Sequence, residues 1–138
     1  MSFDVFAECF GETKQTGLSK EVVHSLFPIS REKPESEIWV VRYDDLNWSE
    51  IHCTPHKGDR QRLTGLWIHR PCGDKRLWEA LYSILELGSV FLLWPNGPLI
   101  LTLGTSVEGL PVGILDDLGL PPVYVRSGLE ILKFLRKT

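Results

Sequence analysis

The chain has 138 residues, of which 43% are hydrophobic and 24% are charged, fractions that fit one folded domain and exclude disorder over most of its length. Its formal net charge is −3 and its cations are scattered, so the basic surface of a nucleic-acid-binding protein is not expected. No apolar run approaches the roughly 18 residues that a membrane-spanning helix requires, so a membrane partner is not expected either.

The first segments predict a strand and a short helix. The alternation of residues 3–10 predicts a strand with one buried face, although Phe6 lies on its polar side. Residues 11–17 are polar and predict a turn. Ser19 is a suitable N-cap for a short helix over residues 20–26.

The next segments predict an exposed loop and three strands. Residues 29–36 are charged and contain a proline, which favours an exposed loop. Residues 37–43 and 48–53 are rich in β-branched and aromatic side chains, and a four-residue turn between them predicts a hairpin. A second turn over residues 54–60 leads to a third strand over residues 63–69.

The stretch from Gly73 to Leu103 predicts a helix followed by a hairpin. Asp74 can accept hydrogen bonds from the first free amides of the helix. The apolar residues recur at helical spacing: Leu77, Trp78, Leu81, Ile84 and Leu85. The dipeptide Asn96-Gly97 predicts a type I′ turn. Trp94 beside this turn is expected either to pack on the helix or to contact a partner.

The last third of the chain predicts a loop, short elements and a final helix. Residues 104–113 are interrupted by glycine and proline, and residues 114–118 can form a single helical turn. Residues 123–125 predict a short strand. Residues 127–130 have the pattern of a capping box at the start of the final helix.

Together these elements predict an α+β fold in a single domain over residues 1–138. We expect a mainly antiparallel sheet with two longer helices and one short helix packed on one face. Three cysteines leave at least one thiol unpaired, and residues 2–10 lack the basic start and long apolar run of a leader. A protein of a reducing compartment, the cytoplasm, is therefore expected.

Two cysteines and two histidines have a spacing that suits zinc. Cys53 and His56 form one pair, His69 and Cys72 form the other, and twelve residues separate the pairs. Two thiolates and two imidazoles satisfy tetrahedral zinc. Against this, Cys53 shares strand parity with Ile51, which favours a core position. We therefore expect no cofactor, and zinc remains the alternative.

Cys72 is a second candidate for chemistry, because it lies beside the start of the predicted helix, where the dipole lowers the pKa of a thiol. Nucleophilic catalysis would also need a base, for which His56 and His69 are the nearest choices. The acidic pairs at 44–45 and 116–117 fit turns better than acid–base catalysis. Since no phosphate-loop or hydrolase motif is present, no residue is predicted to be catalytic.

Several pieces of the chain resemble small bacterial proteins of the immunity type. These pieces are residues 2–6, 47–51, 73–81, 94–97 and 125–128. In their order, and in an acidic, tryptophan-rich α+β composition, they are similar to immunity proteins of polymorphic toxin systems. The resemblance implies a non-enzymatic cytoplasmic protein that binds another protein, a toxin, and occludes its active site.

The first hairpin is the predicted partner-binding surface. Its carboxylates, Asp44, Asp45 and Glu50, can mimic an anionic substrate in a basic cleft. Trp48 supplies an aromatic contact, and strand parity places it on one face with Glu50 and His52. Two alternatives remain: a small zinc-binding or thiol-dependent enzyme using the four cysteine and histidine residues above, and a homodimer that buries an exposed tryptophan surface.

Overall fold

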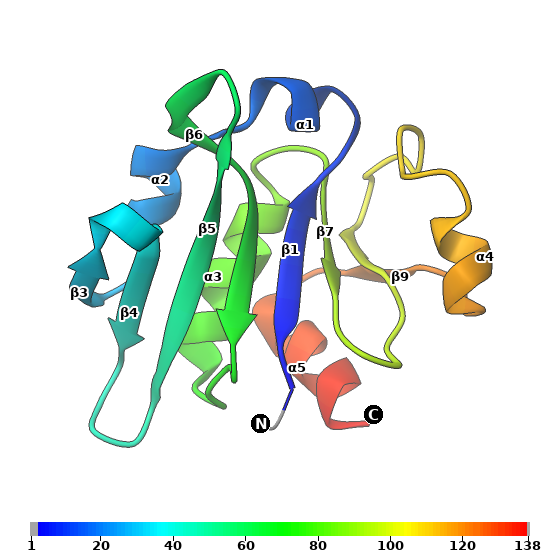
Figure 1. Cartoon of the computed structure of the whole chain (residues 1–138). Coiled ribbons are helices and arrows are strands. Elements are labelled where there is room, and N and C mark those ends of the chain that lie inside the picture. Colours follow the sequence, from blue (N-terminus) through cyan, green and yellow to red (C-terminus); the bar gives the residue numbers. More distant parts are fainter. Residues whose placement is uncertain (1–2, 138) are drawn as a thin grey trace.

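The computed structural model describes residues 3–137, which form one mainly antiparallel sheet with helices (Figure 1). The strands are β1 (Val5–Cys9), β2 (Leu18–Ser19), β3 (Ile29–Lys33), β4 (Ile38–Arg42), β5 (Trp48–His56), β6 (Asp59–His69), β7 (Val90–Leu93), β8 (Ile100–Thr102) and β9 (Val123–Val125). The helices are α1 (Gly11–Thr16), α2 (Lys20–Ser25), α3 (Lys75–Leu85), α4 (Ile114–Leu118) and α5 (Gly128–Arg136), and Pro34–Ser36 form a 3₁₀ turn.

The strand order places the first strand in the middle of the sheet. The order is β3-β4-β5-β6-β1-β7-β8-β9, and β2 pairs separately with β6. Neighbouring strands are antiparallel except β8 and β9, which are parallel. The fold is therefore α+β, as the alternation of helices and hairpins predicted.

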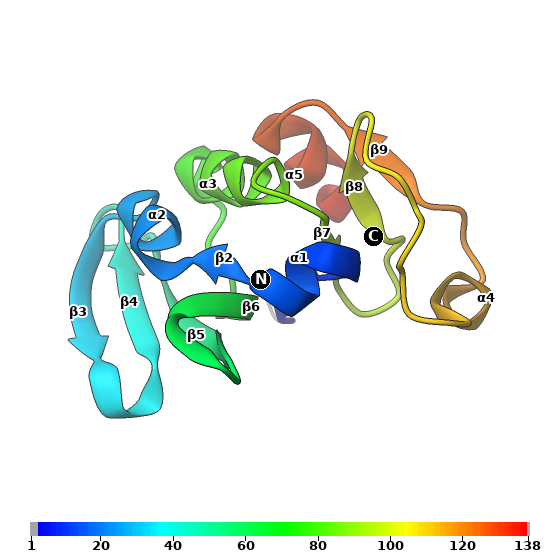
Figure 2. The same cartoon turned by 90° about the horizontal axis from the view of Figure 1, so that it is seen from above.

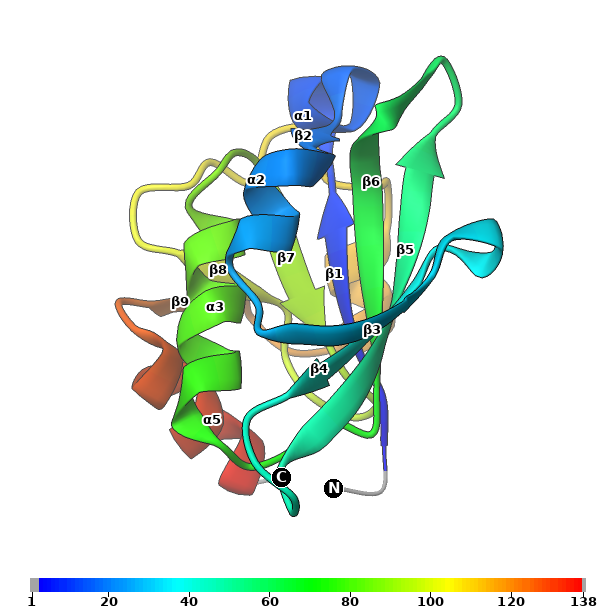
Figure 3. The ribbon, with the colours of Figure 1, turned by 90° about the vertical axis from the view of Figure 1, so that its left-hand side faces the viewer.

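The helices α2, α3 and α5 lie on one face of the sheet (Figures 2 and 3). The main core fills the space between them and the sheet, where Ile51, Ile68 and Trp78 are completely buried. A second, smaller core lies at β7 and β8, where Phe91 and Leu101 pack with side chains of α4. Since α4 lies at the far end of the sheet, no helix of residues 3–137 lies on the outer face of β4, β5 and β6 (Figure 2).

The two longer helices begin as the sequence predicted. Asp74 accepts a hydrogen bond from the Arg76 amide at 2.9 Å, and the Ser127 hydroxyl accepts one from the Glu130 amide at 3.2 Å. Gly128, the first residue of α5, lies against the backbone of α3 so closely that a Cβ there would clash with it. The two helices are thus in contact through their backbones as well as through apolar side chains.

Two segments differ from the sequence prediction. The polar stretch expected to be a turn forms α1, held in place by the Thr13 hydroxyl, which accepts a hydrogen bond from the Ser89 amide at 2.9 Å. The charged stretch expected to be a loop forms β3, which pairs with β4 at the edge of the sheet. Local composition missed α1 because its partner, Ser89, is distant in the sequence. It missed β3 because charged side chains suit an exposed edge strand as well as a loop.

The turn between β7 and β8 is also different. Gly97 donates its amide to the Trp94 carbonyl at 3.1 Å, so Pro95 and Asn96 are the central residues of the turn. Asn96 has φ 65°, whereas the first central residue is proline, which cannot adopt positive φ. The prediction of a type I′ turn is therefore wrong. Trp94 itself is 1% exposed and belongs to the core, so it is not an exposed contact residue.

Within residues 3–137, no helix combines the length and the apolar character needed to cross a membrane.

Candidate functional site

The side of the sheet opposite α2, α3 and α5 carries the most prominent exposed aromatic side chains, and we call it the open face. Along β5 the alternation is regular: Trp48, Glu50 and His52 point outward, whereas Ser49 and Ile51 are buried. The predicted grouping of the three outward residues is confirmed. Trp48 is 48% exposed, an unusual position for so large an apolar ring.

Strand pairing extends this grouping across the sheet in two rows, because residues directly opposite one another share a face. One row places the following side chains in order across four strands: Arg31, Val40, Glu50 and His69. The next row crosses five strands: Lys33, Ile38, His52, Trp67 and Phe6. The open face therefore gathers residues from β3, β4, β5, β6 and β1.

The second row forms a line of rings centred on Trp67. Its ring centroid lies 6.2 Å from that of Phe6, with nearly parallel planes, and 4.5 Å from that of His52. His69 meets it edge-on at 5.9 Å. Trp67 is nevertheless 37% exposed, so the line presents apolar surface to solvent.

Both histidines of the open face lie beside carboxylates. His52 Nε2 is 3.4 Å from Glu50 Oε1, and His69 Nδ1 is 3.1 Å from Asp4 Oδ1. Partial burial opposes ionisation of Asp4, but hydrogen bonds from the Trp67 side chain and the Arg70 amide, together with His69, outweigh it and lower its pKa. Asp4 therefore holds the end of β6 as an ionised acceptor.

Trp48 stands between two hollows of the open face. One hollow, of about 360 Å³, is lined by Ser30, Arg31, Lys33, Val40, Arg42, Trp48 and Glu50. The other, of about 300 Å³, is lined by Trp48, Ser49, Glu50, His69 and Arg70. Trp48 and Glu50 contribute to both, so the two hollows adjoin across these side chains.

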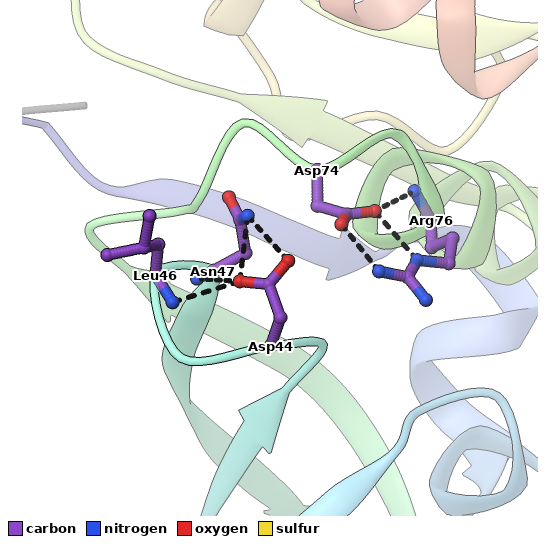
Figure 4. Close-up of polar contacts among 5 residues, drawn as sticks. All are labelled: Asp44, Leu46, Asn47, Asp74 and Arg76. Carbon is purple, nitrogen blue, oxygen red and sulfur yellow. Dashed lines mark hydrogen bonds and ion pairs between the residues drawn. The ribbon is translucent and has the colours of Figure 1, made fainter.

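The predicted acidic residues of the first hairpin have different environments. Asp44 closes the turn by accepting hydrogen bonds from the Leu46 and Asn47 amides at 2.9 and 2.8 Å (Figure 4). The Asn47 side-chain amide and these backbone amides lower the pKa of Asp44. Asp45 is fully exposed, 3.3 Å from the guanidinium of Arg42. Asp44 thus shapes the turn, whereas Asp45 remains accessible.

The four residues considered for zinc are not gathered into one ligand set. Within the described range 3–137, no group of three or more histidine, cysteine or acidic side chains is placed to hold a metal ion. Burial raises the pKa of Cys53 to about 12, so it is a neutral core thiol. His56 accepts the Gly58 amide at Nδ1, 3.0 Å away, and donates from Nε2 to the Gln15 carbonyl at 2.5 Å.

Cys72 is held through its backbone. Its amide donates to the Ser49 hydroxyl at 2.9 Å, and its carbonyl accepts from the Trp78 indole at 3.1 Å. These bonds join the segment before α3 to β5 and to the helix. They account for the position of Cys72 without any use of its thiol.

Sequence reasoning missed Trp67 and the cations near Trp48, although one signal was available. Phe6 and Trp67 are large aromatic residues on the outward side of their strands, and two such residues in neighbouring strands would indicate a shared exposed surface. Comparison with known proteins supplies no further assignment: no family model matches this chain, and no curated protein or solved structure is significantly similar to it.

Proposed function

We propose that this chain is a non-enzymatic protein-binding protein that works through its open face. The observation that carries the proposal is the exposure of Trp48 and Trp67, at 48% and 37%, on a part of the sheet that no helix of the described residues covers. Exposed tryptophans on a continuous surface are typical of interfaces, where aromatic residues supply much of the binding energy.

The shape of the surface favours a macromolecular partner over a small substrate. Enzyme substrates usually bind in deep clefts that bury most of the ligand. The hollows beside Trp48 are instead only partly enclosed, and they adjoin a line of aromatic rings that continues to β1. A partner that covers both features would bury more apolar surface than a small molecule can.

The resemblance to immunity proteins makes a toxin the partner that we propose, with binding in the cytoplasm. In this proposal, Asp45, Trp48 and Glu50 contact the toxin near its active site, and Trp67 extends the contact. Asp44 shapes the turn that presents Asp45. A gene for a secreted protein with a toxic C-terminal domain next to the gene for this chain would support the proposal, and a metabolic operon would oppose it.

Replacement of both tryptophans tests the open face directly. We expect Trp48→Ala/Trp67→Ala to weaken capture of the partner from native extract at least about tenfold, because two aromatic contacts are lost. The measurement is quantitative mass spectrometry of co-purified proteins. Val22→Ala/Leu129→Ala is the matched control, since both side chains are similarly exposed, at 44% and 48%, but lie on α2 and α5, away from the open face.

Two results would contradict this proposal. Equal capture by the tryptophan variant and the unmodified chain would place the binding surface elsewhere. Light scattering that shows a dimer, dissociated by the same tryptophan substitutions, would identify a second copy of the chain as the occupant of the open face.

A further inference from the structure

We propose that the partner reaches the open face with an acidic protein segment, whose aspartate or glutamate side chains bind beside Trp48. This inference rests on the proposed function, because it takes the open face as the binding surface. It goes beyond that function by assigning a negative charge to the contacting segment of the partner and by naming aspartate or glutamate as its contact residues.

The charge around Trp48 is opposite to that of the whole chain. The chain has a formal net charge of −3. In contrast, Arg31, Lys33 and Arg42 line one hollow beside Trp48, and Arg70 lines the other. Among residues 3–137, Glu50 is the only carboxylate that lines either hollow. Of the predicted contact carboxylates, Asp45 lies at the tip of this hairpin and Glu50 lines both hollows.

Most of these cations are available to a partner. Within residues 3–137, no ion pair involves Arg31, Lys33 or Arg70. The pair between Arg42 and Asp45 joins two exposed side chains, and such pairs contribute little. The Glu50 Oε1 atom lies 3.4 Å from Nε2 of His52, a residue of the same strand. Guanidinium groups with free donors bind carboxylates well because they offer two parallel hydrogen bonds.

The arrangement suits a segment that combines carboxylates with apolar side chains. Arg31 is in the same cross-strand row as Glu50 and His69, and Trp48 lies between the hollow lined by Arg31 and the hollow lined by Arg70. A segment crossing Trp48 can therefore place acidic side chains on both sides of the indole. Its apolar side chains would cover the ring, and the charges would fix its position and direction.

A single-stranded nucleic acid also combines negative charge with flat rings, but the open face suits it less well. Proteins that bind single strands stack bases on accessible aromatic faces. The ring of Trp67 instead lies between Phe6 and His52 in its row, so its neighbours occupy the positions where bases would stack. The negative net charge of the chain would also repel a polyanion.

Selection from a random peptide library tests the inference without knowledge of the natural partner. The immobilised full chain is used to select displayed peptides, and the dissociation constants of enriched peptides are measured by fluorescence anisotropy. We expect enriched peptides to carry aspartate or glutamate next to aromatic or aliphatic residues. We also expect their affinity to fall at least about tenfold when the salt concentration rises from roughly 0.05 M to roughly 0.5 M.

Charge reversal on both sides of Trp48 provides the decisive comparison. We expect Arg31→Glu/Arg70→Glu to weaken binding of the selected peptides at least about tenfold. Lys14→Glu/Lys57→Glu changes the net charge equally and replaces exposed lysines elsewhere, so it should leave the affinity within about twofold. Matching thermal unfolding curves for both variants and the unmodified chain show that a lost interaction does not reflect lost folding.

The outcomes separate this inference from the proposed function. Enriched peptides that need Trp48 but show no acidic preference, or that bind the Arg31→Glu/Arg70→Glu variant normally, would overturn the acidic segment and leave the open face as the binding surface. Peptides that bind the Trp48→Ala/Trp67→Ala variant normally would overturn both. Failure to enrich any peptide, or binding of oligothymidylate that requires Trp48, would overturn the acidic protein segment.

Discussion

At the scale of single residues, Glu37 shows how one buried carboxylate joins separate parts of the chain. Its carboxylate lies 2.8 Å from Lys20 Nζ and 2.8 Å from an Arg60 nitrogen, and its side chain is 11% exposed. The hydrogen bond from Lys20 outweighs partial burial and, with Arg60, lowers the pKa of Glu37. Glu37 thus connects the start of α2 with β6 at the beginning of β4.

This connection predicts a pH-dependent contribution to stability. A carboxylate with a lowered pKa stabilises the fold above its unfolded-state pKa, and the contribution is lost as the pH falls through its folded-state pKa. We expect Glu37→Gln to lower the free energy of unfolding by about 2 kcal/mol at neutral pH and by much less near pH 3. Urea denaturation at both pH values measures this, with the exposed Glu35→Gln as the control. An equal effect at both pH values would contradict the ion-pair explanation.

The cysteines predict a second residue-level result. Cys9 and Cys53 are buried, and burial raises the pKa of each thiol to about 12, whereas Cys72 is partly exposed. We expect a thiol reagent to label only Cys72 in the native protein and all the cysteines after denaturation, because thiolates are the reactive species. Intact-mass measurement counts the labels. Rapid labelling of native Cys53 would show that its strand opens.

At the scale of elements, Gly128 determines how closely α5 approaches α3. The Leu129 amide also donates to the Glu79 side chain of α3 at 3.2 Å, which satisfies one free amide at the start of α5. A Cβ at position 128 would meet the backbone of Trp78 and Glu79, which no side-chain rotation can relieve. The start of α5 would then have to move away from α3.

We therefore expect Gly128→Ala to lower the free energy of unfolding by about 3 kcal/mol, even though alanine favours helices. Urea denaturation measures the change. Gly73→Ala is the matched control, because no atom lies near the Cβ position there and its φ is not positive. A neutral Gly128→Ala would mean that the two helices can separate slightly without loss of packing.

The elements that the sequence predicted are those with local signals. Asp74 and Ser127 identified the starts of α3 and α5, because an N-cap depends only on the next few residues. The hairpin of β4 and β5 was similarly evident from its turn. In contrast, α1 depends on a distant segment, because Thr13 binds the Ser89 amide, and the composition near Thr13 carries no information about that partner. The strand β3 pairs with the next strand in the sequence, but its charged composition suits an exposed loop as well as an edge strand.

At the scale of the whole molecule, the open face could be predicted only in part. Strand alternation correctly placed Trp48, Glu50 and His52 together, because it requires only one strand. Strand alternation could not show that Phe6 lies beside Trp67, or that Arg31 lies in the same cross-strand row as Glu50. Each of these placements depends on which strands become neighbours. The cationic surroundings of Trp48 were missed for this reason, and the net charge of the chain gave the opposite expectation.

The central position of β1 has a consequence for folding. This strand is synthesised before both of its partners: it bonds on one side to β6, which begins at Asp59, and on the other to β7, which begins at Val90. The hydrogen-bonding edges of β1 therefore remain unpaired until β6 and then β7 have left the ribosome. Closing such long loops costs entropy before any contact compensates, so refolding should take milliseconds to seconds, as in other proteins dominated by distant strand pairs. During that interval Val5 and Ala7, fully enclosed in the finished protein, are accessible to chaperones and to other unfolded chains.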